Sequence, residues 1–370
     1  MPKWHIELDD ILDSSFFEPY PFREISSKGI ALYGAGDMGK MALDFFKKSG
    51  IKPFYIIDKN KSGLLDGIKI LNPKDISLDD KKSLTFIVSI ATIPLNPIYD
   101  FLKNDGFVDI RHFYDLSEIL FKDAMSNGWI EEKADKDELE YVLKLLEHDN
   151  KSVAHYLQFL WWRLKRKENI SSEFPVLCNQ KFFKAPCMPK LNENECFLDG
   201  GAHHGQSLSS FFKATNHQYE KVWAFEPDNR NISILKENIK NEIDIYGKAL
   251  HYRCENVAFQ DALCYASKVI NSGDISVEAV TIDSLNINPT IIKLHIEGGE
   301  YNALIGASKT IKDNRPIVMV LADHNKDGLY SIPKYLGDLE SYKIYFYLHD
   351  YCGNSAVYYA IPNERVIHES

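Results

Sequence analysis

The chain contains one local pattern twice: a short apolar run, then a glycine-rich turn, then a segment with helical spacing. The first copy joins Ile30–Tyr33 to the loop Gly34–Gly39, and the second joins Cys196–Leu198 to the loop Asp199–Gly205. Glycines permit positive φ and let the backbone approach a ligand closely. Each copy therefore predicts the first strand, ligand loop and helix of a parallel α/β unit.

The first loop opens a segment in which strand and helix patterns alternate. We expect two helices, Lys40–Ser49 and Ile98–Asn104, and three further strands, Phe54–Ile57, Thr85–Ile90 and Val108–Phe113. This alternation predicts a small parallel sheet with helices on both faces. We place this smaller, Rossmann-like domain at residues 1–115.

Strand patterns stop near Leu116, and helical spacing takes over. Glu138–Glu147 and Val153–Leu164 carry it, which predicts a helical connector over residues 116–185. Trp161 and Trp162 lie in its last part. Because large aromatic side chains mostly serve cores and interfaces, we expect these two to pack between domains.

Composition excludes several classes of protein. The net charge of -10 argues against a general nucleic-acid binder, which needs a basic face. One basic run, Arg163 and Lys165–Lys167, is interpreted as a solvated helix face. No apolar run approaches the length of a membrane span. The six cysteines form no C-x-x-C pair, so we expect no zinc knuckle and a protein of the reducing cytoplasm.

The second loop opens a larger α/β domain, which we place at residues 186–370. Its expected strands after Cys196–Leu198 are Val222–Phe225, Ile291–Ile296, Pro316–Leu321, Tyr342–Leu348 and Ala356–Ile361. Its expected helices are Ser207–Ala214, Asn229–Asn241 and Tyr301–Ile311.

Two acidic residues distinguish the ligand of this second loop from a dinucleotide. Asp199 ends the strand where a pyrophosphate would lie; a carboxylate there repels phosphate but accepts hydrogen bonds from an ammonium group. Glu226 ends the next strand, where an acid can bind both ribose hydroxyls. The pair favours S-adenosylmethionine (SAM), which has an ammonium group and no phosphate.

Three ordered motifs resemble those of the FkbM-type methyltransferases. They are DGGAHHG at Asp199–Gly205, AFEP at Ala224–Pro227 and IKLHIEGGE at Ile292–Glu300. The resemblance implies a class I methyltransferase sheet, doubly wound and ending in an antiparallel strand. It also implies O-methylation of a sugar or glycan hydroxyl, and so a small-molecule or glycan acceptor as partner.

The resemblance further assigns cofactor residues. Asp199, Gly201 and Gly205 would hold the methionine end of SAM, with His203 in the same loop, and Glu226 would hold the ribose. Two more residues, Glu255 and Asn256, would lie near the adenine.

The third motif departs from the family, which usually has aspartate where this chain has His295. Glu297 lies two residues further on, on the same side if the strand continues. His324 follows the next strand and should reach the same edge of the sheet. A neutral histidine suits the removal of a hydroxyl proton, so His324 is the first candidate for the catalytic base and His295 the second. This interpretation requires no metal ion, although the side chains of His295, Glu297 and His324 are all of types that bind metals.

The first glycine loop leaves alternatives open. Gly34, Gly36 and Gly39 match G-x-G-x-x-G, and Asp58 ends the next strand, as in a dinucleotide site. Asp37 lies inside the loop and disfavours pyrophosphate. A nucleotide or sugar-nucleotide site, a site without a ligand and an NAD site are all compatible with it.

Three functions follow from these patterns. The first is a SAM-dependent methyltransferase, and the second an NAD-dependent oxidoreductase that uses the first loop. The third is a non-catalytic nucleotide- or SAM-binding protein. An oligomer is compatible with each.

Overall fold

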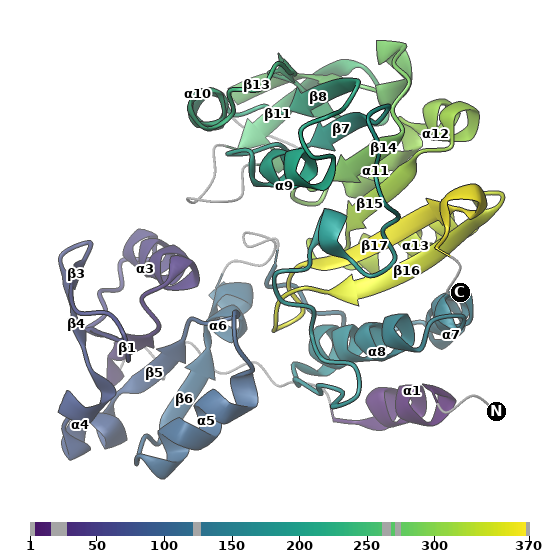
Figure 1. The fold of residues 1–370 in the computed structure, drawn as a ribbon. Coiled ribbons are helices and arrows are strands. Elements are labelled where there is room, and N and C mark those ends of the chain that lie inside the picture. Colours follow the sequence, from purple (N-terminus) through teal and green to yellow (C-terminus); the bar gives the residue numbers. More distant parts are fainter. Residues whose placement is uncertain (1–3, 16–27, 121–126, 261–267, 271–274, 368–370) are drawn as a thin grey trace.

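The computed structural model describes residues 4–15, 28–120, 127–260, 268–270 and 275–367. Strands in these residues form sheets of six, seven and four strands. Figure 1 shows the six-stranded sheet with its helices as one unit, and the other two sheets in a second, larger unit. The chain therefore has the expected α/β architecture, with two glycine loops in two different sheets.

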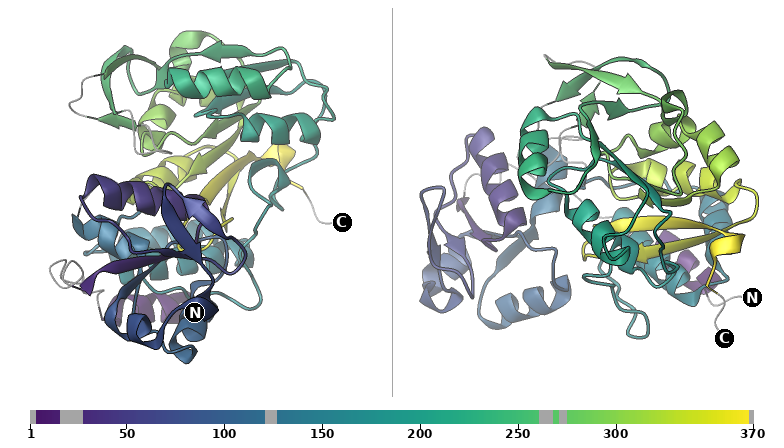
Figure 2. Two further views of the ribbon diagram at one scale, coloured as in Figure 1. Left: turned by 90° about the vertical axis from the view of Figure 1, so that its left-hand side faces the viewer. Right: turned by 45° about the horizontal axis from the view of Figure 1, so that its top comes forward.

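The six-stranded sheet has the order β3-β4-β2-β1-β5-β6, and β1 pairs in parallel with β2 and β5. This confirms the predicted small parallel sheet. In the left view of Figure 2 the six-stranded unit faces the viewer. Its strands are β1 Ile30–Tyr33, β2 Ile56–Ile57, β3 Gly63–Leu65, β4 Ile68–Leu71, β5 Thr85–Val88 and β6 Asp109–His112. Its helices are α3 Asp37–Lys48, α4 Leu78–Ser83, α5 Leu95–Asn104 and α6 Phe113–Leu120.

The seven-stranded sheet has the order β16-β17-β15-β14-β7-β8-β9. β17 pairs antiparallel with both β15 and β16, while the other pairings in this sheet are parallel, which confirms the expected antiparallel last strand. The strands are β7 Cys196–Gly200, β8 Lys221–Phe225, β9 Asp244–Tyr246, β14 Ile291–Leu294, β15 Ile317–Leu321, β16 Tyr342–Leu348 and β17 Ala356–Pro362. The helices are α9 Gln206–Ala214, α10 Asn229–Asn238, α11 Glu300–Ile305, α12 Ser308–Asn314 and α13 Ser331–Gly337.

The helix expected over Tyr301–Ile311 is two helices, α11 and α12, divided at Gly306. A Cβ on Gly306 would lie 2.1 Å from the carbonyl oxygen of His251, so only glycine permits this approach. The segment around His251 leads into the four-stranded sheet, which the sequence patterns did not predict. Its strands are β10 Ala249–Leu250, β11 Glu255–Gln260, β12 Lys268–Ile270 and β13 Ile275–Val280.

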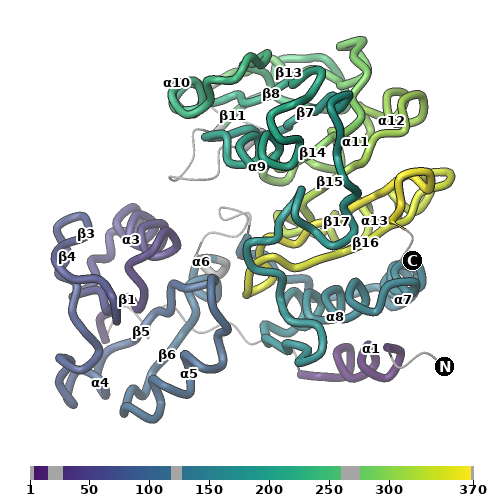
Figure 3. Tube along the Cα trace, in the orientation of Figure 1, coloured from purple at the N-terminus to yellow at the C-terminus, as the bar shows by residue number. Residues whose placement is uncertain are grey.

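The connector helices α7 (Lys136–Leu146) and α8 (Asn150–Lys165) pack on the seven-stranded sheet. The backbone N–H of Phe346 in β16 donates to Ser152 Oγ (2.9 Å), and that of Leu348 donates to His155 Nδ1 (3.1 Å). Side chains of α8 thus occupy donors of an edge strand that another chain could otherwise pair with. The first helix, α1 (Trp4–Asp13), lies along α8, far from the six-stranded sheet (Figures 1 and 3).

The basic run is not a solvated helix face as a whole, because Arg163 and Arg166 are buried. The Arg163 guanidinium donates to the carbonyls of Asp323 (3.1 Å) and Gly353 (2.9 Å), in loops that follow β15 and precede β17. A buried guanidinium needs such acceptors, and these carbonyls supply them. The α8 helix is therefore attached to the edge of the sheet at which polar residues gather.

Trp162 packs between the two units, as predicted. Its ring meets that of His112 edge-on, with centroids 5.3 Å apart, and it belongs to the same buried cluster as the core of the six-stranded unit. Trp161 instead donates to Glu7 of α1 (3.1 Å). Among the described residues, no helix has the length and apolarity needed to cross a membrane.

Candidate active site

The loop after β7 brings the backbone close to the end of β14. Gly201 has a φ of +76°, and a Cβ there would lie 1.9 Å from the carbonyl oxygen of His295. Gly205 has a φ of +89° and precedes the first turn of α9. Both positions therefore need glycine, one for a close approach and one for a left-handed turn.

Asp199 is fully buried and already has partners. One carboxylate oxygen accepts from Lys293 Nζ (2.7 Å), and the other accepts from the Ser207 hydroxyl. The same ammonium donates to the carbonyls of Gly200 (3.1 Å) and Gly201 (2.8 Å). The ion pair of Asp199 and Lys293 thus fixes the conformation of the glycine loop. Any contact of Asp199 with a cofactor would come in addition to this structural role.

Glu226, at the end of β8, holds the same loop from the other side. It accepts from the backbone N–H groups of His203 (2.9 Å) and Asp228 (3.0 Å), and from the Asn231 amide (3.3 Å). A carboxylate offers about four acceptor positions, so capacity for a further donor remains. Burial raises the pKa of Glu226 above its usual value, against these hydrogen bonds, which lower it.

The other side chains assigned to the cofactor have contacts of their own. Glu255 and Asn256 begin β11 of the four-stranded sheet, and Glu255 pairs with Arg253 and with His251 (3.5 Å). The His203 ring stacks on that of the adjacent His204, with centroids 3.7 Å apart.

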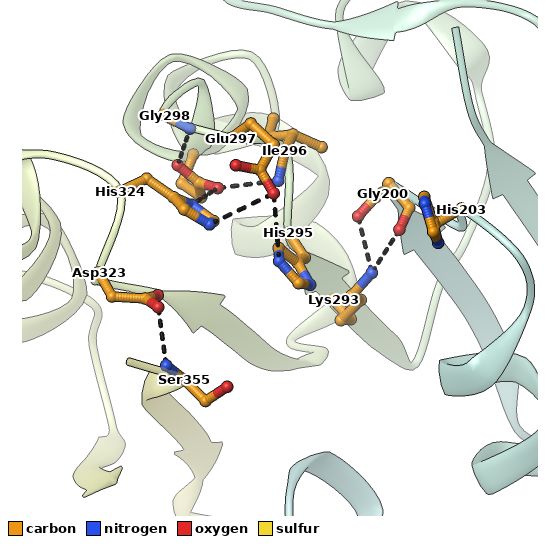
Figure 4. Close-up of polar contacts among 12 residues, drawn as sticks. Gly200, His203, Lys293, His295, Ile296, Glu297, Gly298, Asp323, His324 and Ser355 are labelled. Carbon is orange, nitrogen blue, oxygen red and sulfur yellow. Dashed lines mark hydrogen bonds and ion pairs between the residues drawn. The ribbon is translucent and has the colours of Figure 1, made fainter. Parts of the chain in front are cut away.

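Three of the predicted catalytic residues come together at the carboxyl end of β14 and β15. Figure 4 shows Glu297 between the two histidine rings. Its Oε1 lies 3.6 Å from Nε2 of His295 and 3.6 Å from Nε2 of His324. The rings are stacked at 17°, with centroids 5.2 Å apart. We name these three residues the His–Glu–His cluster.

The cluster depends on a turn and not on strand alternation. β14 ends at Leu294, and Glu297 has a φ of +53°, followed by Gly298 at +103°. This left-handed turn directs the Glu297 carboxylate back toward His295. The prediction that both side chains meet is thus confirmed, while its reason, an extended strand, is wrong.

Glu300, which the sequence analysis did not single out, organises the cluster from behind. Its Oε1 lies 2.7 Å from His324 Nδ1, and its carboxylate also accepts from the backbone N–H groups of Ile296 (2.8 Å) and Gly298 (2.9 Å). It belongs to the third motif, as does Lys293, so their presence in a strand-end motif was the available signal.

The two histidines of the cluster differ in exposure and in charge. The His295 side chain is 33% exposed and that of His324 only 2%. Burial alone would lower the pKa of His324, but Glu297, Glu300 and Asp323 outweigh it and raise the pKa to about 10. Desolvation lowers the pKa of His295 well below its usual value, against Glu297. The preference for His324 as base therefore finds no support in its surroundings.

His349 and Asp323 lie outside the cluster. His349 bonds to the Tyr359 hydroxyl (2.7 Å) and the Leu177 carbonyl (3.2 Å), so it is a buried structural residue. Asp323 accepts from the backbone N–H of Ser355 (2.7 Å), as Figure 4 shows.

Asp58, which follows β2, is hydrogen-bonded to the first glycine loop. Asp58 accepts from the backbone N–H groups of Ala35, Asn60 and Lys61, each at 2.9 Å. These three bonds outweigh burial and lower its pKa. Gly34 has a φ of +118°, and a Cβ on Gly39 would lie 2.1 Å from the carbonyl oxygen of Gly34, whereas a Cβ on Gly36 meets no neighbouring atom. Asp58 thus supports the loop directly, and nothing in this arrangement selects one ligand.

Comparison with protein families assigns both units. Residues 199–342 match the methyltransferase FkbM domain, and residues 29–94 match the PglD N-terminal domain. No curated protein matches the chain.

Several solved structures are similar to this chain. Methyltransferase FkbM from Methylobacillus flagellatus KT is 17% identical, with a TM-score of 0.65 over 96% of this chain and 98% of that one. An rRNA methylase from Streptococcus thermophilus is 10% identical, covering 47% and 89% with a TM-score of 0.31. A Podospora anserina methyltransferase with bound SAH is 11% identical, covering 64% and 91% with a TM-score of 0.28. The first of these shows that the fold extends over nearly the whole chain.

Proposed function

We propose that this chain binds SAM and methylates a hydroxyl group of a small-molecule or glycan acceptor, since residues 199–342 match the methyltransferase FkbM domain. One observation carries the proposal: the glycine loop and the His–Glu–His cluster meet at one edge of the sheet. Gly201 touches the backbone of His295, so a cofactor on the loop and an acceptor at the cluster would be neighbours.

The residues of the loop fit SAM. Glu226 retains acceptor capacity for ribose hydroxyls, and the Lys293 ammonium beside the loop is paired with Asp199. The first turn of α9 follows Gly205 without a side-chain cap, so its backbone N–H groups can receive the carboxylate of the methionine moiety. When bound, SAM supplies a methyl group on a positively charged sulfur.

The chain's part in the reaction is to orient the acceptor and to provide for its proton. The acceptor O–H bond breaks as the new O–C bond forms and the C–S bond opens, so the products are a methyl ether, a thioether and one proton. His295 and Glu297 are the members of the cluster that an acceptor can reach, since His324 is enclosed. A sugar as acceptor rests on the family resemblance.

Calorimetric titration of the full chain with SAM tests this proposal, with NAD titrated separately. Glu226→Gln should weaken SAM binding about tenfold or more, because a charge-assisted hydrogen bond contributes about 1.5–3 kcal/mol. Glu237→Gln is the matched control, since it removes the same charge from an exposed position of α10.

Equal SAM affinity in the two folded variants would contradict the cofactor assignment. Binding of NAD alone would instead support the oxidoreductase, and SAM binding without turnover of any acceptor would support a binding protein.

A further inference from the structure

From the geometry of the His–Glu–His cluster we infer a site for one divalent transition-metal ion. Its ligand atoms are Nε2 of His295, Oε1 of Glu297 and Nε2 of His324, with Glu300 as the outer carboxylate. The ion binds on the acceptor side of the active site. The site itself rests on the cluster alone, whereas its role in methyl transfer rests on the proposed function.

The spacing of the three side chains fits a common ion. One potential ligand atom from each residue lies within 4.8 Å of the others. The Glu297 oxygen is 3.6 Å from each histidine nitrogen. Two ligands at about 2.1 Å from a tetrahedral metal are about 3.4 Å apart, so little movement is required at Glu297. The two rings are nearly parallel and can close on the ion by small rotations of their side chains.

A second observation that supports a metal site is the contact of His324 with Glu300, on the side of the ring away from Glu297. Metal-binding histidines usually bond through the other ring nitrogen to a carboxylate or carbonyl, which fixes the tautomer and the ring orientation. Nδ1 of His324 is 2.7 Å from Glu300 Oε1, and Nε2 faces Glu297. Glu300 is itself buried and held by two backbone N–H groups, so this carboxylate cannot turn away.

The turn that carries Glu297 is built to hold it in place. A non-glycine residue at positive φ is energetically costly and is kept where the surroundings enforce it, often at a functional site. Here the amide of Asn325, the residue after His324, donates to the Gly298 carbonyl (2.9 Å). The two segments that supply the ligands are therefore tied to each other directly.

Ligand chemistry narrows the ion. Two imidazole nitrogens and one carboxylate suit Mn²⁺, Co²⁺ or Zn²⁺, whereas Mg²⁺ and Ca²⁺ prefer sites made of oxygen only. Three protein ligands leave at least one coordination position for an oxygen of the acceptor. A hydroxyl bound there loses its proton to solvent more readily and is held at the edge that also carries the glycine loop.

The test is metal binding by the full chain, measured after treatment with a chelator and removal of that chelator. Calorimetric titration with Co²⁺ and with Zn²⁺ should give one ion per chain, and Co²⁺ should show the visible absorption of a site with nitrogen ligands. His295→Ala and the isosteric Glu297→Gln should each weaken binding at least tenfold. Glu300→Gln should weaken it about 10–100-fold, as outer-carboxylate substitutions do.

His217→Asn is the matched control, because His217 is an exposed histidine beyond the C-terminal end of α9, whereas the loop precedes its N-terminal end, and asparagine tolerates its φ of +59°. It should bind the ion as the parent does. Binding of no ion by the parent, or equal affinity in the parent, His295→Ala and Glu297→Gln, would overturn the site.

SAM affinity of the stripped protein, measured in parallel, separates the two proposals. SAM binding without metal binding would end only the metal inference, and metal binding without SAM binding would end only the methyltransferase proposal. Circular dichroism confirms that each variant is folded.

Discussion

Asp199 is enclosed by its own chain before any ligand enters. Its partner Lys293 is buried as deeply, so neither charge has access to water. Removing one member of a buried ion pair leaves the other charge without compensation, which typically costs about 3–5 kcal/mol. Asp199→Asn should therefore lower the free energy of unfolding by about this amount, as measured by urea denaturation.

The double variant Asp199→Asn, Lys293→Met is the control, because it removes both charges and should recover most of the loss. A single variant as stable as the parent would show that the pair contributes nothing. Since Asp199 supports the loop, a loss of SAM affinity in this variant would report loop order as well as contact, and the same holds for Glu226, which accepts from the His203 N–H.

At the residue scale the sequence identified which side chains gather but not how they pair. Motif spacing placed Asp199, Glu226, His295 and Glu297 at strand ends, where parallel sheets collect their ligands. Lys293 could not be assigned to Asp199 in the same way, because their register across β7 and β14 is a tertiary feature.

At the scale of elements, the connector helices belong to the fold of the larger unit. Leu160 and Phe159 of α8 share a buried cluster with Phe346 and Tyr358 of the sheet. The predicted connector, 116–185, lies outside the predicted methyltransferase domain. The packing changes this division, because a fragment starting near Ser171 would lose α7 and α8 and expose to water the surface of β16 that they cover.

A fragment of residues 128–370 should unfold cooperatively and bind SAM, whereas residues 171–370 should not fold. Thermal unfolding followed by circular dichroism distinguishes them. A cooperative transition in the shorter fragment would restore the original domain boundary.

Strands with a mostly apolar sequence were the most predictable elements, and strands joined by a tight local turn the least. β1 begins and ends where predicted, as does β16. The β3–β4 hairpin was missed although its turn, Asp66-Gly67, has both residues at positive φ and is a common hairpin signal. The four-stranded sheet was missed because its strands pair with one another, away from the regular alternation of strands and helices.

For the whole molecule, buried neutral histidines set the response to acid. Burial lowers the pKa of His112 and His349 to about 3 and that of His155 to about 4. Below about pH 6.5 the unfolded chain binds protons at these sites and the folded chain does not. Stability is therefore fully present above that pH and lost as the pH falls, by about 1.4 kcal/mol per pH unit for each histidine.

Asp115 offsets part of this loss, because burial raises its pKa to about 6. As the pH falls, Asp115 therefore binds its proton at a higher pH in the folded chain than in the unfolded chain. Urea unfolding at about pH 7 and about pH 5 should show the net loss. His155→Gln, which can keep both hydrogen bonds, should reduce the slope by the share of one histidine. Equal stability at both pH values would contradict the assignment of these histidines as neutral.

Because α1 packs on the larger unit, the smaller unit is an insertion in the chain of the larger one. Along the chain, α1, which packs on α8, is followed by the six-stranded unit and then by α7. The six-stranded unit is therefore connected to the larger unit at both of its ends. A protease that cuts once between Asp13 and Ile30 would leave it joined through its other end, and α1 would stay in place through its non-covalent contacts. Two cuts would be needed to release it. Joining Asp13 directly to the segment before α7 would instead give a shorter chain, in which the methyltransferase unit keeps every helix that covers its sheet.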